Sequence, residues 1–188
     1  MISARLRILL AVVPLSLAPG MASGPAAAAP PPASSAGPKI VVGQPAPPFS
    51  FKTFDRTAVT SEQLRGKVIV INLWATWCTP CKSEMPMMDN YYRANKHKGL
   101  EIIGVQTEDS LQPYKLKAVD DALAYPLALS FRGQVYKNWT AVPTSYVIDR
   151  RGIVRFADAG VFTLRSFDAL LRPLLAEPAP EAPPMPTK

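Results

Sequence analysis

The fold of this chain is decided by the stretch Lys67-Val-Ile-Val-Ile-Asn-Leu-Trp-Ala-Thr-Trp-Cys-Thr-Pro-Cys81. Its first half is almost continuously apolar and β-branched, which is typical of a central strand covered on both faces. The second half passes into a helical pattern that extends from Cys78 to about Lys96 and ends at Gly99. A buried strand that turns directly into a helix predicts an α/β domain with two cysteines at the start of that helix.

Strands and helices alternate along the chain on both sides of this stretch. The phenylalanines of 49–54 predict a strand whose partner begins near Val59, and 61–66 predicts a helical turn closed by Gly66. We expect further strands at 100–105, 127–129, 144–148 and 153–156, a helix at 110–124 capped by Asp109 or Ser110, a short helical piece at 134–139, and a last helix at 163–176. This order predicts a mixed sheet that combines parallel crossovers with a terminal antiparallel hairpin, whose loop is 149–152.

The chemistry of the chain is expected at Cys78 and Cys81, which are close enough in sequence to form a disulfide within one helical turn. The start of a helix favours an anion, so the pKa of the Cys78 thiol is expected to fall from about 8.5 toward 7. Cys78 is then the attacking thiol, and Cys81, one turn deeper and more buried, resolves the mixed disulfide. Pro80 costs no hydrogen bond at this early helical position. A passive disulfide and a metal site are the alternatives for such a pair.

Composition excludes several other classes of protein. The chain has 188 residues, a net charge of +7, two cysteines and one histidine. A disulfide scaffold needs more cysteines, and a structural zinc site needs four ligands where Cys78, Cys81 and His97 supply three. The basic residues are scattered in pairs without interleaved aromatic residues, which does not favour a nucleic-acid partner. We expect no cofactor and no resident metal.

The N-terminal residues indicate export. Arg5 and Arg7 precede an apolar stretch from Ile8 to Ala18, and small residues follow, so 1–22 has the pattern of a signal peptide. A signal anchor, with 8–21 held in the membrane, is the alternative. Residues 23–40 read as a Pro/Ala-rich tether and 177–188 as a Pro-rich disordered tail. The sequence thus predicts a globular domain over 41–176 in the periplasm or another extracytoplasmic compartment.

Several motifs together resemble a known family. The segment Trp74-Ala-Thr-Trp-Cys-Thr-Pro-Cys-Lys82 resembles the active site of the thioredoxin fold. Ile71–Trp74, Glu84-Met-Pro86, 41–49, 141–144 and 146–154 resemble the TlpA/ResA/DsbE branch of exported thioredoxins. The resemblance covers about 41–176. It implies a thioredoxin fold, with a central mixed sheet flanked by helices and an N-terminal β-hairpin extension, and an enzyme that reduces partner-protein disulfides at the Cys78–Cys81 pair.

The same resemblance suggests roles for further residues. It implies a cis bond between Val142 and Pro143 that faces the cysteines, so that Val142 and Thr144 are candidates for pairing with an extended substrate segment. Glu84 is a candidate proton shuttle that raises a thiol pKa by charge repulsion, with a surface residue of the first helical turns as the alternative. Trp77 is expected to shield the cysteines and contact substrate, or simply to pack.

The resemblance also bears on partners. It implies a disulfide-containing exported protein as substrate and a membrane thiol-electron donor of the DsbD/CcdA type. Cytochrome c maturation, oxidase assembly and general thiol reduction are all open as its pathway. Asn72 stands where cytoplasmic thioredoxins carry a buried acid, so that proton acceptor is missing from this chain.

Two other activities of the same fold are considered. Met85, Met87 and Met88 near the cysteines suit Cu(I) handling, although methionines at helical spacing also fit a packed core. A peroxidase shares the Ala46-Pro-Pro-Phe49 motif, but its nucleophile follows Pro and Thr, which Ala75-Thr-Trp77 does not match. Copper handling is therefore kept as the alternative to disulfide reduction.

Overall fold

The structure, a computed structural model, describes residues 40–108 and 112–180. Its elements in chain order are β1 (Ser50–Lys52), β2 (Ala58–Thr60), β3 (Val68–Trp74), α1 (Thr79–Asn95), the 3-10 turn η1 (Lys96–Lys98), β4 (Leu100–Gln106), α2 (Pro113–Asp120), β5 (Ser130–Arg132), the 3-10 turn η2 (Gln134–Lys137), β6 (Thr144–Ile148), β7 (Val154–Ala159) and α3 (Leu164–Ala176). The signal, tether and tail segments lie wholly or largely outside the described residues. Within those residues, no helix has the length and apolar character needed to cross a membrane.

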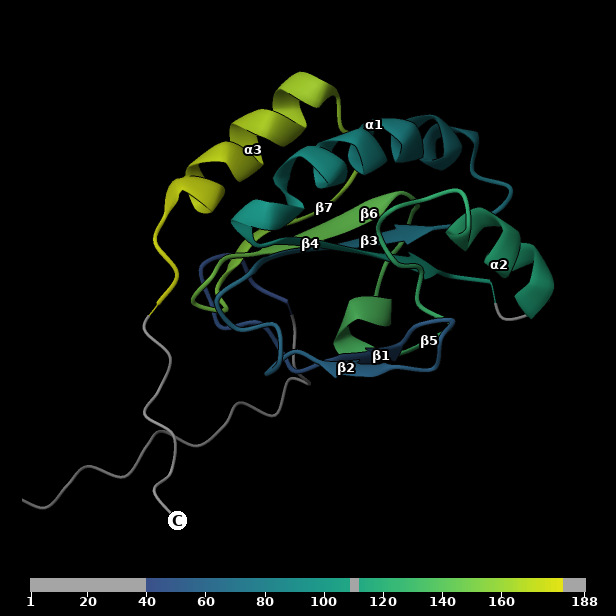
Figure 1. Ribbon diagram of the computed structural model, residues 1–188, viewed down its shortest axis with the longest axis horizontal. Coiled ribbons are helices and arrows are strands. Elements are labelled where there is room, and N and C mark those ends of the chain that lie inside the picture. Colours follow the sequence, from purple (N-terminus) through teal and green to yellow (C-terminus); the bar gives the residue numbers. More distant parts are fainter. Residues whose placement is uncertain (1–39, 109–111, 181–188) are drawn as a thin grey trace, which may run out of the picture. The chain divides into compact units, whose positions relative to one another are not determined.

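A four-stranded sheet in the order β4-β3-β6-β7 forms the centre of the domain. β4 runs parallel to β3, whereas β6 runs antiparallel to β3 and β7 antiparallel to β6. Figure 1 shows α1 and α3 on one face of this sheet and the small sheet β2-β1-β5 on the other. β3 is buried at every position because both faces are covered, as its continuous apolar pattern predicts.

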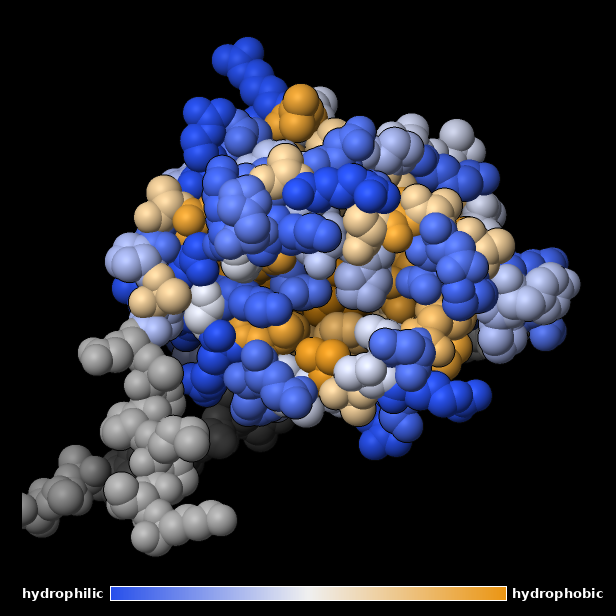
Figure 2. All heavy atoms as spheres, in the orientation of Figure 1, coloured by the Kyte–Doolittle hydropathy of each residue, from blue (hydrophilic) through white to orange (hydrophobic). Residues whose placement is uncertain are grey.

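Each face of the central sheet has its own apolar core. Val68, Val70 and Trp74 point toward α1 and α3, while Ile69, Ile71 and Leu73 point toward the small sheet. This alternation follows from the two-residue period of a strand. In Figure 2 hydrophilic side chains cover most of the visible face, and apolar side chains show between the helical layer and the small sheet. The thioredoxin-type α/β architecture with an N-terminal β1–β2 hairpin is therefore confirmed.

Two expected elements differ from the structure. The strand expected at 127–129 is reduced to a single bridge between Leu127 and Gly104, and the strand forms instead at β5, which pairs with β1. The helix expected at 110–124 covers only Pro113–Asp120. It stops because the Asp120 carboxylate accepts the Leu127 N–H at 3.0 Å, which folds the chain back into a turn. The expected caps Asp109 and Ser110 lie outside the described residues.

The chain enters the domain by pairing with the β6–β7 hairpin. The Gly43 N–H donates to the Val154 carbonyl at 2.8 Å, and the Ala46 N–H donates to the Gly152 carbonyl at 2.8 Å. Gly152 has a φ of 81°, which fits its place in this tight turn. In the register of β3 with β6, Ile69 lies beside Ile148 and Leu73 beside Thr144. The hairpin turn therefore lies at the opposite end of the sheet from the start of α1.

Candidate active site

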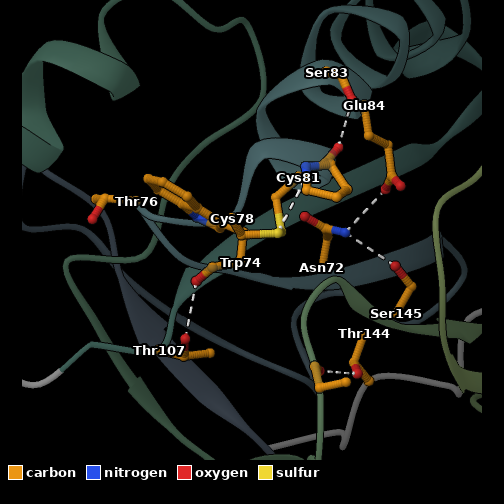
Figure 3. The surroundings of a disulfide bond; sticks show 12 residues. Asn72, Trp74, Thr76, Cys78, Cys81, Ser83, Glu84, Thr107, Thr144 and Ser145 are labelled. Atoms are coloured by element: carbon orange, nitrogen blue, oxygen red, sulfur yellow. Dashed lines mark hydrogen bonds between the residues drawn. A yellow bond between two sulfur atoms is a disulfide. The ribbon is translucent and has the colours of Figure 1, made fainter.

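Cys78 and Cys81 form a disulfide at the N-terminal end of α1, with their Cα atoms 5.3 Å apart. Cys78 occupies the N-cap position in an extended conformation, and its Sγ accepts a hydrogen bond from the Cys81 N–H at 3.2 Å (Figure 3). That bond would also stabilise a thiolate on Cys78. Pro80 lies in the first helical positions, as expected. The predicted difference in burial is not found in this oxidised state, since both cysteines are buried.

Trp77 precedes the pair and is 65% exposed. Its alternative role as a packed core residue is therefore excluded, because most of the indole faces solvent. The loop that carries it connects β3 to α1, so its position is fixed at one end by the sheet and at the other by the disulfide. This leaves Trp77 available to a partner that approaches Cys78.

Glu84 lies one turn after Cys81 and is only 3% exposed, so the interpretation as a surface residue is wrong. Residues three apart on a helix share a face, which places Glu84 on the side of Cys81. Its Oε1 accepts from the Asn72 Nδ2 at 3.3 Å, and its Oε2 accepts from the Phe162 N–H at 2.9 Å. Asn72 also donates to the Ser145 Oγ at 3.1 Å, so β3, β6 and α1 meet at this carboxyl (Figure 3).

Burial changes the protonation of Glu84. Removal from water raises its pKa to about 7, and the hydrogen bonds from Phe162 and Asn72 oppose only part of this rise. A carboxyl with this pKa changes between acid and base near neutral pH. Asn72 thus stands where cytoplasmic thioredoxins carry a buried acid, and it donates a hydrogen bond to Glu84. The sequence does not reveal this contact.

The loop before β6 comes to the same end of the sheet. The Val142–Pro143 peptide bond is cis, as the resemblance implies. Thr144 pairs with Leu73, five residues before Cys78, so this segment lies beside the chain that leads to the disulfide. The Thr144 Oγ1 donates to the Ala141 carbonyl at 2.6 Å and is buried, so its side chain supports the loop, while its backbone lies between β3 and β7.

The residues that suggested copper handling are placed in the core. Met85 and Met88 are buried among the side chains between α1 and the sheet, which supports their packing interpretation. His97 belongs to η1, at the other end of a helix roughly 25 Å long. The imidazole thus lies at the other end of α1 from the two sulfurs, whereas Met85 lies one helical turn after Cys81 in the same buried cluster.

The basic residues that look scattered in the sequence partly converge in the structure. The buried Arg150 guanidinium donates to three carbonyls, at 2.7 Å to Gly66, 2.6 Å to Lys98 and 3.1 Å to Leu175. The backbone next to Arg65, Lys67 and Lys98 therefore meets Arg150 at the end of the domain away from Cys78. Arg150 is buried, whereas Arg65, Lys96, Lys98 and Arg151 are exposed, in keeping with a solvated basic surface.

Comparisons with known proteins agree with this site. Residues 42–157 match the AhpC/TSA family. The chain is 34% identical to the thiol-disulfide oxidoreductase ResA of Oceanobacillus iheyensis over 137 residues, which cover 69% of this chain and 71% of that protein. It is 30% identical to the thioredoxin-like protein YneN of Bacillus subtilis over 136 residues, or 70% and 79% of the two chains.

The fold is also similar to that of a solved structure. The fold resembles the crystal structure of a thiol:disulfide interchange protein of the thioredoxin family from Chlorobium tepidum TLS, with a TM-score of 0.62 and 28% identity. The match covers 72% of this chain and 99% of that one. The chain therefore belongs to the AhpC/TSA family, in its TlpA/ResA/DsbE-like branch of thioredoxin-fold proteins, and is a thiol–disulfide oxidoreductase.

Proposed function

We propose that this protein reduces disulfides of exported proteins in an extracytoplasmic compartment, with Cys78 as nucleophile. The observation that carries the proposal is the Cys78–Cys81 disulfide at the start of α1 with the buried Glu84 carboxyl one turn further along the helix. The first feature supplies the exchangeable pair, and the second favours the reducing direction.

The exchange conserves electrons in two steps. The Cys78 thiolate attacks one sulfur of the partner's disulfide, forms a mixed disulfide and releases the other partner sulfur as a thiolate. The Cys81 thiol then loses its proton, and its sulfur attacks the Cys78 Sγ. This step forms the Cys78–Cys81 bond and releases the second partner sulfur. The partner gains two electrons, and the cysteine pair loses two.

Glu84 is the group proposed to accept the Cys81 proton. Its pKa of about 7 leaves roughly half of the carboxyl ionised at neutral pH, so it serves as a base during attack and as an acid during re-reduction. An ionised Glu84 also disfavours a nearby thiolate by charge repulsion. Because a stabilised reduced form makes a cysteine pair oxidising, this repulsion lowers the reduction potential and favours reduction of partners.

Substrate contacts are proposed around the cysteines. The exposed Trp77 offers an apolar surface beside Cys78, and the backbone of Val142, just before β6, offers hydrogen-bonding groups to an extended segment of the partner. Thr144 takes part by supporting this segment, since its hydroxyl is bonded to Ala141 and its backbone lies between Leu73 and Ala159. Pro143 lies between Val142 and Thr144.

Export and re-reduction complete the proposal. The arrangement of 1–22, with two arginines before an apolar stretch, supports a signal peptide or an anchor through 8–21. An oxidising compartment requires a source of electrons to restore the dithiol. A membrane thiol-electron donor of the DsbD/CcdA type fits this need, and cytochrome c maturation is one pathway that a reductase of this kind serves.

A glutathione redox titration of the full chain tests the direction of exchange. We expect a potential well below about −130 mV, and a value near or above that figure would contradict the reductase role. Incubation of the Cys81→Ser variant with an extract of exported proteins should trap mixed disulfides through Cys78. The matched Cys78→Ser variant should trap none, and equal trapping by both variants would reassign the nucleophile.

A further inference from the structure

The short loop from Ala75 to Cys78 sets the position of the nucleophile. It leaves the buried end of β3 and carries the exposed Trp77 before reaching Cys78. Two residues that directly follow β4 hold this loop by hydrogen bonds. The first is Thr107, whose N–H and Oγ1 both donate to the Trp74 carbonyl, at 3.0 Å and 3.1 Å.

Glu108 holds the loop through two further hydrogen bonds. Its Oε2 accepts from the Thr76 N–H at 2.6 Å, and its Oε1 accepts from the Thr76 Oγ1 at 2.9 Å. One carboxylate thus binds both the main chain and the side chain of the residue two positions before Cys78. Two-point binding fixes orientation as well as position, and bonds to a charged acceptor are stronger than neutral ones.

The carboxyl of Glu108 differs from that of Glu84 in its protonation. Partial burial opposes its ionisation, but the hydrogen bonds from the Thr76 N–H and hydroxyl favour the charged form, and the pKa of Glu108 lies below its ordinary value. Glu84 is shifted in the opposite direction. Glu108 therefore remains an anion, and its bonds to Thr76 remain intact, while Glu84 exchanges its proton.

We propose that Glu108 is a positioning residue for thiol–disulfide exchange, which holds the Ala75–Cys78 loop so that the Cys78 sulfur and Trp77 meet a partner protein in the geometry of attack. Exchange needs the attacking sulfur in line with the partner's disulfide, and small displacements of a reacting atom are costly in rate. The inference rests on the proposed nucleophilic role of Cys78.

The test compares three single variants of the reduced full-length protein. The second-order rate constant for reduction of insulin, as a protein disulfide, is measured together with the rate for the small disulfide DTNB. Glu108→Ala should lower the insulin rate constant at least about tenfold and the DTNB rate much less, because DTNB needs no contact with Trp77. Glu108→Gln should recover most of the loss, since its amide accepts from the Thr76 N–H and donates to the Thr76 Oγ1.

A matched control is Glu101→Ala, which removes a carboxylate from the far end of β4, where Glu101 pairs with Lys67. It should leave both rates unchanged. If Glu108→Ala and Glu108→Gln lower the insulin rate constant equally, the charge of Glu108 matters and its positioning of the loop does not. An unchanged insulin rate constant in Glu108→Ala would overturn the proposal.

A double-mutant cycle shows whether Glu108 acts through Thr76. Thr76→Val removes only the hydroxyl bond, so Thr76→Val/Glu108→Ala should be no slower than Glu108→Ala alone. If the losses in rate of the two single variants add up in the double variant, the inference is contradicted. Cys78→Ser distinguishes the two proposals. If the Cys78→Ser variant still reduces insulin, Cys78 is not the nucleophile. If Cys78→Ser is inactive while Glu108→Ala is fully active, only the role of Glu108 is refuted.

Discussion

The buried carboxyl of Glu84 predicts that the oxidised protein loses stability as the pH rises. The pKa of this carboxyl is about 7 in the folded protein against 4.5 for an ordinary glutamate, mainly because of burial. Between these values the folded state binds more protons than the unfolded state, so the free energy of unfolding falls with increasing pH. The stability that the folded state owes to holding Glu84 as a neutral acid is fully present below pH 4.5 and is lost above pH 7.

The size of the effect follows from the shift. One pKa unit corresponds to about 1.4 kcal/mol, so the full shift corresponds to about 3 kcal/mol, and relaxation of the protein around the charged carboxylate reduces our expectation to about 2 kcal/mol. Glu84→Gln removes the titration but can keep both hydrogen bonds. Its amide oxygen accepts from the Phe162 N–H, and its NH2 donates to Asn72 once the Asn72 amide turns over and accepts from the Ser145 hydroxyl.

Urea unfolding of the oxidised protein at pH 4.5, 6 and 8 measures this effect, because the cysteines do not titrate while they form the disulfide. The free energy of unfolding of the wild type should fall by about 2 kcal/mol relative to Glu84→Gln across this range. Glu177→Gln, which removes a carboxyl at the end of α3, should stay parallel to the wild type. A difference between wild type and Glu84→Gln that stays constant within about 0.5 kcal/mol would refute the reasoning.

Three further variants test separate contacts. Trp77→Ala should slow reduction of a protein disulfide while changing the free energy of unfolding by less than about 0.5 kcal/mol, because the indole is mostly exposed; a large loss of stability would show that it packs. Arg150→Gln should destabilise the fold by about 3 kcal/mol in chemical denaturation, since three carbonyls, one of them in a buried bond, lose a charged donor, whereas the neighbouring Arg151→Gln should cost less than about 1 kcal/mol. Gly104→Ala should destabilise by about 1–3 kcal/mol, because its Cβ would lie 2.3 Å from the Leu127 Cδ2, and Leu127→Ala in the same chain should remove that clash, so additive losses would point to another cause.

The strand, the helix and the cysteine pair could be predicted because each depends on local pattern. β3 is apolar at nearly every position, and the helix that follows is bounded by Cys78 and Gly99. The cis bond before Pro143 was predicted only through family resemblance, since nothing local to that sequence distinguishes it from an ordinary turn.

The contacts that tune the site could not be predicted, because they join residues far apart in the chain. Glu84 looks like a surface residue until the segment before α3 supplies the Phe162 N–H from 78 positions away. Glu108 meets Thr76 across 32 positions, and the spacing between them carries no pattern. β5 was missed for a similar reason, since its three residues become a strand only by pairing with β1.

The pairing of Gly43–Ala46 with the β6–β7 hairpin has a mechanical consequence. A pull on the chain from its N-terminal side would load the hydrogen bonds between this segment and residues 152–154 first. Those bonds adjoin the turn that Arg150 fastens to the ends of three other segments, so the load would spread into that turn and those segments. The loop that holds Cys78 lies at the other end of the sheet and would remain free of that tension.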